Sequence, residues 1–250
     1  MNNLIVNMAG YSSYPILERI FTELKSVPSE FINENYLTML TKYTKNVLEN
    51  IKKNSKTTED KKALGKELTD SKLYDINIFW NIVVLPSTEV KLDFKVKDYA
   101  VKCLVNILES SMSISEQLIV KAFDSIKTNA LSIIGCIKFI MNCYKDLKKN
   151  KNIKSSIKKY TSKESGLLDK IITSLLNYKE GKTFDRKYEE TLKDYFDFIG
   201  FIIELNKGTL QFSQEQLDTL WKSFVTNKTS QEEANFFYRQ LIKPSNKAKK

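Results

Sequence analysis

Residues 33–51, NENYLTMLTKYTKNVLENI, decide the fold of this chain. Apolar and aromatic side chains recur here at every third or fourth position: Tyr36, Leu37, Leu40, Tyr43, Val47, Leu48 and Ile51. That spacing places them along one side of an α-helix, with polar and charged residues on the other side. The stretch therefore predicts an amphipathic helix that packs its apolar side against other helices.

The same period recurs along most of the chain. Further helices are expected over residues 14–27, 73–85, 96–108, 113–126, 131–144, 161–176, 188–205, 213–224 and 230–242. The run 73–85 is rich in β-branched residues, which makes a strand conceivable, but its helical neighbours favour a buried helix. Helices of this length joined by short links pack as antiparallel neighbours. We therefore predict one all-α domain over 1–250, made of stacked helix pairs in a HEAT/armadillo-like α-solenoid, with an irregular helical bundle as the alternative.

Four of the expected helices begin with a Ser or Thr that stands three residues before Glu or Gln. This spacing predicts a capping box, in which two side chains satisfy backbone amides at the helix start. The pairs are Ser113 with Glu116, Thr161 with Glu164, Ser213 with Gln216, and Ser230 with Glu233.

The residues that are rare or missing restrict the function. The chain has no histidine, seven glycines and four prolines. Imidazole is the usual acid–base group near neutral pH and a common zinc ligand, and phosphate-cradling loops need closely spaced glycines. We therefore expect no enzyme, no catalytic residue, no metal and no cofactor.

Paired carboxylates and tryptophans are the remaining candidates for chemistry or binding. Glu189–Glu190 and Glu232–Glu233 are adjacent, so on a helix each pair points to different sides and is expected to face solvent. Tryptophan is frequent at interface hot spots. However, Phe79–Trp80 and Trp221 with Phe224 lie on continuous apolar stripes, which favours core positions for both.

Three cysteines, Cys103, Cys136 and Cys143, form no C-x-x-C motif. Cys136 and Cys143 are seven residues apart and share a helix face, so core packing in a reducing compartment is expected. The beginning of the sequence has no signal-peptide pattern, and no apolar run is long enough to span a membrane. We therefore predict an intracellular protein, placed in the cytoplasm with the nucleus left open.

The net charge of +10 is concentrated in two places. Residues 145–163 contain eight lysines and one acid, and residues 243–250 contain four lysines and no acid. We interpret 148–160 as a lysine-rich connector, 244–250 as a basic tail and 52–69 as a further polar connection, because like-charge runs are commonly solvated. The residues that would contact an anion are Lys148, Lys149, Lys151, Lys154, Lys158 and Lys159.

Several blocks of the sequence carry a family resemblance. They are residues 31–40, 73–83, 98–104, 216–222 and 235–241. Together and in this order they resemble the armadillo-like helical arm of very large ubiquitin-specific proteases, the fat-facets group and its relatives. The resemblance implies a helical scaffold beside a separate catalytic domain, with a link to the ubiquitin system. The cysteine and histidine boxes of that family are absent, so no catalytic residue transfers to this chain.

Two functional hypotheses from different classes are favoured over a third, a metal-free enzyme of unknown type. The first is a non-catalytic scaffold that binds protein partners along a face of successive helices. The second is a module whose lysine-rich connector binds anionic surfaces, either phosphoinositide headgroups or RNA backbone. Steep weakening by salt would distinguish the second from the first.

Overall fold

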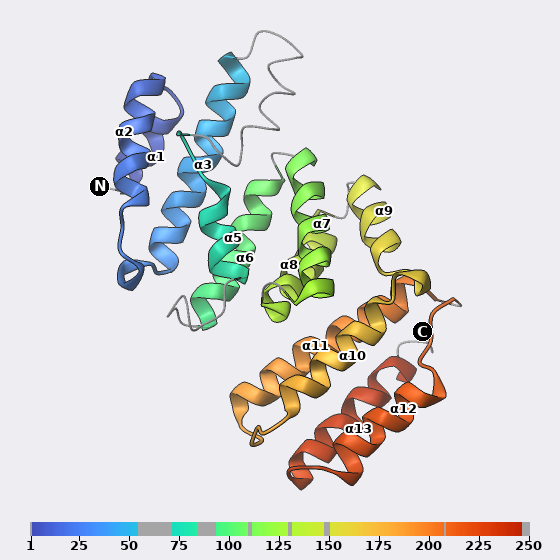
Figure 1. The fold of residues 1–250 in the computed structure, drawn as a ribbon. Coiled ribbons are helices and arrows are strands. Elements are labelled where there is room, and N and C mark those ends of the chain that lie inside the picture. Colours follow the sequence, from blue (N-terminus) through green and yellow to red (C-terminus); the bar gives the residue numbers. More distant parts are fainter. Residues whose placement is uncertain are drawn as a thin grey trace. The chain divides into compact units, whose positions relative to one another are not determined.

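A computed structural model describes residues 2–54, 72–84, 94–109, 112–129, 132–147, 151–207 and 209–246 (Figure 1). Over these residues the chain is helical and contains no strand, which confirms the predicted all-α class. The chain divides into two compact units. Unit 1 holds the described residues of Met1–Ser125 and Asn129–Lys154, and unit 2 those of Ile126–Thr128 and Ser155–Lys250. This differs from the single domain expected over 1–250, because apolar periodicity identifies helices one at a time and not which of them pack together.

Unit 1 contains the long helix α3. Its elements are α1 (Asn2–Ala9), α2 (Tyr14–Lys25), the 3-10 turn η1 (Ser29–Phe31), α3 (Glu34–Asn54), α5 (Ile76–Val84), α6 (Phe94–Leu108), most of α7 (Met112–Thr128), and α8 (Ile133–Asp146). Helix α3 packs against α1 and α6, and α5, α6 and α8 pack against one another. The helix expected over 33–51 is thus confirmed.

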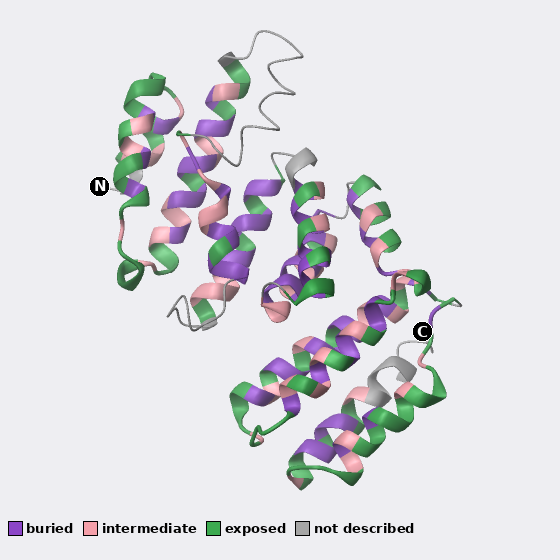
Figure 2. Cartoon of the chain, in the orientation of Figure 1, coloured by how far each residue is buried: buried purple, intermediate pink, exposed green. Residues whose placement is uncertain are grey.

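Buried and exposed residues alternate along the long helices (Figure 2). On α3 the predicted stripe is buried at Leu37, Leu40 and Tyr43, each at most 1% exposed. The Tyr43 hydroxyl donates to the Leu17 carbonyl at 2.9 Å, which satisfies its polar end inside the core. The Tyr36 hydroxyl likewise donates to the Leu24 carbonyl at 2.8 Å, so hydrophobic spacing and two tyrosine hydrogen bonds fix α3 against α2.

The apolar run from Ile76 to Val84 is the buried helix α5, as expected, and not a strand. It approaches α8 very closely at Gly135: an added Cβ there would lie 2.0 Å from the Val83 carbonyl oxygen. The Ser132 amide also donates to the Val84 carbonyl at 2.8 Å. Only a residue without a side chain allows this contact between two backbones.

Unit 2 continues from the end of α9. Its elements are the last part of α9 (Lys151–Tyr160), η2 (Lys163–Ser165), α10 (Leu167–Lys179), α11 (Arg186–Leu205), α12 (Gln214–Trp221), the π-helical segment η3 (Lys222–Thr226) and α13 (Gln231–Asn246). Helix α11 packs against α10 and α13, and α13 packs against η3. Phenylalanines fill the space between them: Phe224 and Phe237 stack at 5.2 Å, and Phe196 lies edge-on to Phe224 at 5.7 Å.

Three predicted connections need correction. Residues 151–160 of the lysine-rich connector 148–160 are the helix α9, because Ile153 and Ile157 stand four apart and are both fully buried. Lys52 and Lys53 of the polar connection 52–69 are in the last turn of α3, where basic side chains suit the helix dipole. The backbone of α13 continues two residues beyond Pro244, to Asn246, into the expected tail 244–250. Residues 55–69, 148–150 and 247–250 lie outside the described residues.

Candidate functional site

Helix α9 places the predicted anion-binding lysines on different sides. Lys151, Lys154 and Lys158 follow i, i+3, i+7 spacing and share the solvent face, opposite the buried isoleucines. Lys159 is rotated by about 100° from Lys158. Lys148 and Lys149 lie outside the described residues. In unit 1 the Lys154 ammonium lies over the Tyr144 ring at 6.0 Å. The six lysines therefore do not form one described cluster.

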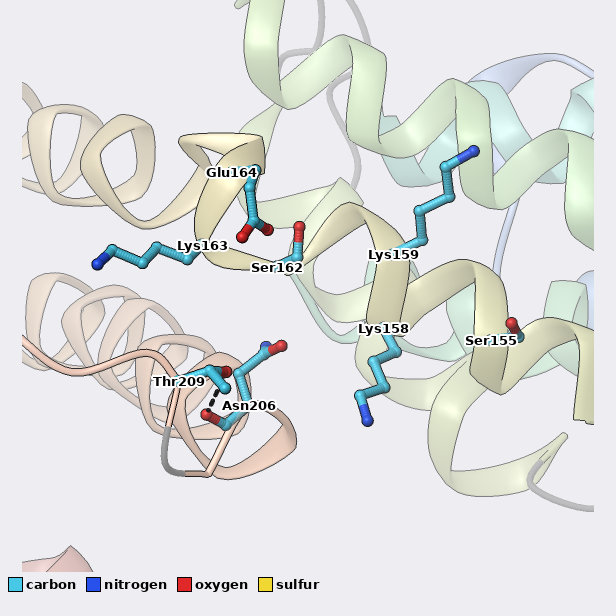
Figure 3. A pocket seen from close by; sticks show the side chains of 8 residues that line it. All are labelled: Ser155, Lys158, Lys159, Ser162, Lys163, Glu164, Asn206 and Thr209. Atoms are coloured by element: carbon cyan, nitrogen blue, oxygen red, sulfur yellow. Dashed lines mark hydrogen bonds between the residues drawn. The ribbon is translucent and has the colours of Figure 1, made fainter.

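Two of these lysines line a hollow in unit 2, which we call the lysine pocket. It has a volume of about 580 Å³ and is lined by Ser155, Lys158, Lys159, Ser162, Lys163, Glu164, Asn206 and Thr209. Lys158 extends from α9 toward the side where Asn206 and Thr209 lie, while Lys159 and Lys163 point away from it (Figure 3). The pocket thus adds Lys163 and two serines to the residues predicted from the sequence.

The frame of the pocket is held by a buried amide. The Asn206 Nδ2 group donates to the Thr161 carbonyl at 2.9 Å and to the Ile202 carbonyl at 2.9 Å. It also lies 3.2 Å from Thr161 Oγ1, while Thr209 Oγ1 donates to the Asn206 carbonyl at 3.0 Å. Since buried polar groups are costly to leave unpaired, these bonds keep the end of α11 against the end of α9.

The capping box expected at Thr161 and Glu164 is wrong. Thr161 is buried, and its hydroxyl donates to the Lys158 carbonyl at 3.2 Å. Helix α10 begins only at Leu167, after Gly166 with a left-handed φ of 63°. Glu164 is exposed instead. A hydrogen bond from its own amide and one from the Ser162 hydroxyl lower its pKa, so at neutral pH the pocket lining contains one carboxylate.

A second candidate is an aromatic surface, which we define as Leu217, Trp221 and Tyr238. Trp221 is 46% exposed, Tyr238 37% and Leu217 36%. The Trp221 and Tyr238 rings meet edge to face with centroids 5.6 Å apart. Leu217 stands one turn before Trp221 on α12. The three side chains thus form one apolar surface on the α12–η3–α13 hairpin.

This surface corrects the core position predicted for Trp221. Phe224 is fully buried, as expected, and so are Phe79 and Trp80 in unit 1. The sequence shows two parallel lines of apolar side chains here, Leu217 with Trp221 and Leu220 with Phe224, each pair four residues apart. Leu220 and Phe224 fill the core, so the other line remains outside.

The hairpin is held in place by a buried ion pair that the sequence reading missed. Lys179 at the end of α10 donates to both carboxylate oxygens of Glu233 on α13, at 2.8 Å each. Glu233 also accepts from the Tyr188 hydroxyl at 2.8 Å and from the Thr229 amide at 2.7 Å. The solvent exposure predicted for Glu232–Glu233 is therefore wrong for Glu233, which has no exposed surface.

The surroundings of Glu233 set its charge. Burial acts to raise the pKa of Glu233, but the hydrogen bonds from Lys179, Thr229 and Tyr188 outweigh it, so the pKa is lowered. Burial and the bond to Glu233 together raise the pKa of Tyr188. The Thr229 hydroxyl also donates to Glu233 at 3.0 Å, so the cluster is an ionised carboxylate with donors from three residues. Ser230 caps α13 by accepting from the Glu233 amide at 3.2 Å, half of the predicted capping box.

Of the other predicted capping boxes, that of Ser213 and Gln216 is confirmed in both directions. The side chain of Ser113 lies outside the described residues. The cysteines are buried, as expected for core packing. Burial raises the pKa of Cys136 to about 12, which leaves it as the unreactive thiol at neutral pH.

Further searches of the described residues were negative. They contain no group of His, Cys, Asp and Glu side chains suited to hold a metal ion. Among the described helices, none has the length and apolar composition needed to cross a bilayer.

The comparisons with known proteins also return nothing. No family model matches the chain, and neither a curated protein nor a solved structure matches it. The resemblance to the helical arm of ubiquitin-specific proteases therefore stays a prediction.

Proposed function

We propose that this chain is a non-catalytic helical module that binds a protein partner, and that the aromatic surface of unit 2 is the contact. The observation that supports this most is Trp221, which is 46% exposed on a well-anchored hairpin. Tryptophan is enriched among the residues that dominate binding energy at protein interfaces.

The surface is suited to binding because it is already ordered. Trp221 and Tyr238 hold each other edge to face, and the hairpin beneath them is fixed by the Lys179–Glu233 pair. Side chains that are fixed before binding lose little conformational entropy when a partner arrives. Aromatic rings also bury a large area with few rotatable bonds, so even a small contact can be specific.

The rim around the apolar centre is polar. Gln214 and Asp218 pair with each other on α12, and Arg239 on α13 lies 3.8 Å from Glu189. An apolar centre with a polar rim is the usual composition of a protein–protein contact. We also propose that the helices stack in pairs in a HEAT-like arrangement, and that the chain is a scaffold beside a deubiquitinase. The family resemblance supports both.

Substitution of the aromatic surface tests the proposal. Proteins retained from a cell extract by the immobilised chain are quantified for the wild type, Trp221→Ala and Tyr238→Ala. We expect Trp221→Ala to lose a specific partner by roughly 30-fold in affinity, which is the scale of a hot spot. The matched control is Tyr11→Ala, which removes an aromatic ring that is 90% exposed in unit 1. A partner lost equally with both variants, or with neither, contradicts the proposed contact.

The non-catalytic part has its own test. The isolated chain is incubated with ubiquitin conjugates, and release of ubiquitin is followed over hours. We expect no turnover, and turnover that survives purification would contradict this part of the proposal.

A further inference from the structure

We propose that the lysine pocket of unit 2 binds a small, multiply phosphorylated molecule, with Lys158 as the main contact and Ser155 and Lys163 beside it. This inference does not depend on the aromatic surface, because no residue is shared between the two.

The lining is rich in cations. Lys158, Lys159 and Lys163 stand against one carboxylate, Glu164. In the described part of the chain neither Lys158 nor Lys159 forms an ion pair. Two other lysines of unit 2 are paired, Lys179 with Glu233 and Lys207 with Glu204. The pocket therefore has an excess of positive charge that a bound anion can neutralise.

The end of α9 and the turn after it supply most of the donors. Ser155, Lys158 and Lys159 follow i, i+3, i+4 spacing on α9, and Ser162 lies just beyond the end of the helix, so hydroxyl and ammonium groups line this side of the pocket. Lysine acts as a point charge on a flexible stem and binds phosphate without the planar fork of arginine. Thr209 is less suited to donate, because its hydroxyl already donates to the Asn206 carbonyl.

The backbone on this side of the pocket is held in place. The Asn206 amide joins the Thr161 carbonyl to the end of α11 beneath the pocket. Only the lysine tips must reorient: Lys158 already faces the Asn206 side, and Lys159 and Lys163 point outward (Figure 3). A phosphate in the hollow would attract these tips inward, since their stems carry four rotatable bonds.

The volume of the pocket favours a small molecule as its ligand. A hollow of about 580 Å³ is within the range of small-molecule sites and exceeds the space that a single phosphate needs. It suits a ring that carries several phosphates. An extended nucleic-acid strand would instead require a groove with aromatic stacking platforms, and the lining contains no aromatic residue.

Glu164 allows the negative charge of the ligand to be tested. Its carboxylate lies in the lining and repels an anion, so Glu164→Gln removes a repulsion and Lys158→Gln removes an attraction. Both residues are exposed, and the two substitutions keep similar side-chain sizes. Opposite effects on affinity are expected only if an anion binds in this pocket.

The test uses the full chain and inositol hexakisphosphate as the probe, with calorimetry at about 50 and 200 mM salt. We expect Lys158→Gln to weaken binding by roughly tenfold or more, the scale of one charge-assisted hydrogen bond, and Glu164→Gln to strengthen it. The control is Lys193→Gln, an exposed lysine of α11 outside the pocket. Circular dichroism checks that each variant keeps its helices.

Two further arms separate the sources of the phosphate groups. Phosphatidylcholine vesicles with and without a phosphoinositide test a lipid headgroup, and a single-stranded RNA tests the nucleic-acid alternative. Binding of free inositol hexakisphosphate supports the pocket, whether or not the chain also binds the phosphoinositide vesicles. Binding to the vesicles would show in addition that a lipid can present the ligand. Three outcomes would overturn the proposal. They are no binding of the free probe, equal weakening by Lys158→Gln and Lys193→Gln, and binding of RNA alone.

Discussion

The two units are stabilised in different ways. Unit 1 brings two backbones together at Gly135 and Val83, and its buried polar residues are uncharged. Unit 2 has both of the charged residues that are buried among the described ones, Lys179 and Glu233. One unit therefore depends on close apolar packing, and the other on a desolvated ion pair whose two halves need each other.

This difference predicts different sensitivities. A close backbone contact fails when volume is added to it. A buried ion pair fails when one partner is removed, because the remaining charge is left without compensation. The two tryptophans allow each unit to be followed separately, since Trp80 is in unit 1 and Trp221 is in unit 2. Trp80→Phe leaves Trp221 as the reporter, and Trp221→Phe leaves Trp80.

The largest expected effect comes from Lys179→Met. It leaves Glu233 buried without its ammonium partner, which costs about 3–5 kcal/mol of unfolding free energy. Urea denaturation in the Trp80→Phe background measures it. The control Lys193→Met changes an exposed lysine and should alter stability by less than about 0.5 kcal/mol. A Lys179→Met/Glu233→Leu double variant should be more stable than Lys179→Met alone; if it is less stable, the ion-pair account is wrong.

The next largest effect on stability is expected from the substitution of Gly135, with Gly200 as its control. Gly135→Ala places a methyl group against the Val83 carbonyl and should destabilise unit 1 by about 1–3 kcal/mol, with Trp80 as the reporter. Gly200 on α11 is the matched control, because an added Cβ there meets no atom within 4 Å. Gly200→Ala should raise helix stability by up to about 1 kcal/mol. Similar changes from both substitutions would contradict the close contact of α5 and α8.

The response to acid sharpens the comparison further. The pKa of Glu233 is lower in the folded chain than the usual glutamate value, so its stabilisation is complete above the unfolded pKa of about 4.3. That stabilisation is lost as the pH falls through the lower, folded pKa. We expect Glu233→Gln to reduce the loss of unit 2 stability between about pH 5 and 3. The pKa of its neighbour Glu232 is also lowered, by hydrogen bonds from its own amide and from Ser230. Glu232 is fully exposed, however, and solvent screens these interactions, so Glu232→Gln should change the pH profile less than Glu233→Gln.

The smallest expected effect is at the start of α12. Ser213→Ala removes the hydroxyl that accepts from the Gln216 amide and should cost about 1 kcal/mol. Ser213→Thr retains a hydroxyl and should cost much less. Equal losses from both variants in urea denaturation would show that the cap contributes little.

The sequence predicted the helices well, because 3.6-residue periodicity is a local property. It identified α3 and favoured helix over strand for α5. It did not predict α1, or α9, where lysine density hid the pair Ile153 and Ile157. Division into two units depends on which helices pack together, and apolar spacing within each helix does not contain that information.

The candidate sites were predicted less well, because they depend on long-range contacts. Lys179 and Glu233 are 54 residues apart, and Glu233 beside Glu232 has the pattern of a solvated surface. Asn206 similarly meets Thr161 across 45 residues. Trp221 was expected in the core because two apolar lines run along α12, and the spacing does not tell which of them faces inward.

Acrylamide quenching of tryptophan fluorescence tests the central claim most directly. Trp221 is 46% exposed and Trp80 is 1% exposed. In the native chain, the Trp80→Phe variant should therefore be quenched strongly and the Trp221→Phe variant hardly at all. Equally weak quenching of both would mean that Trp221 is buried, and the surface proposed to bind a partner would not exist.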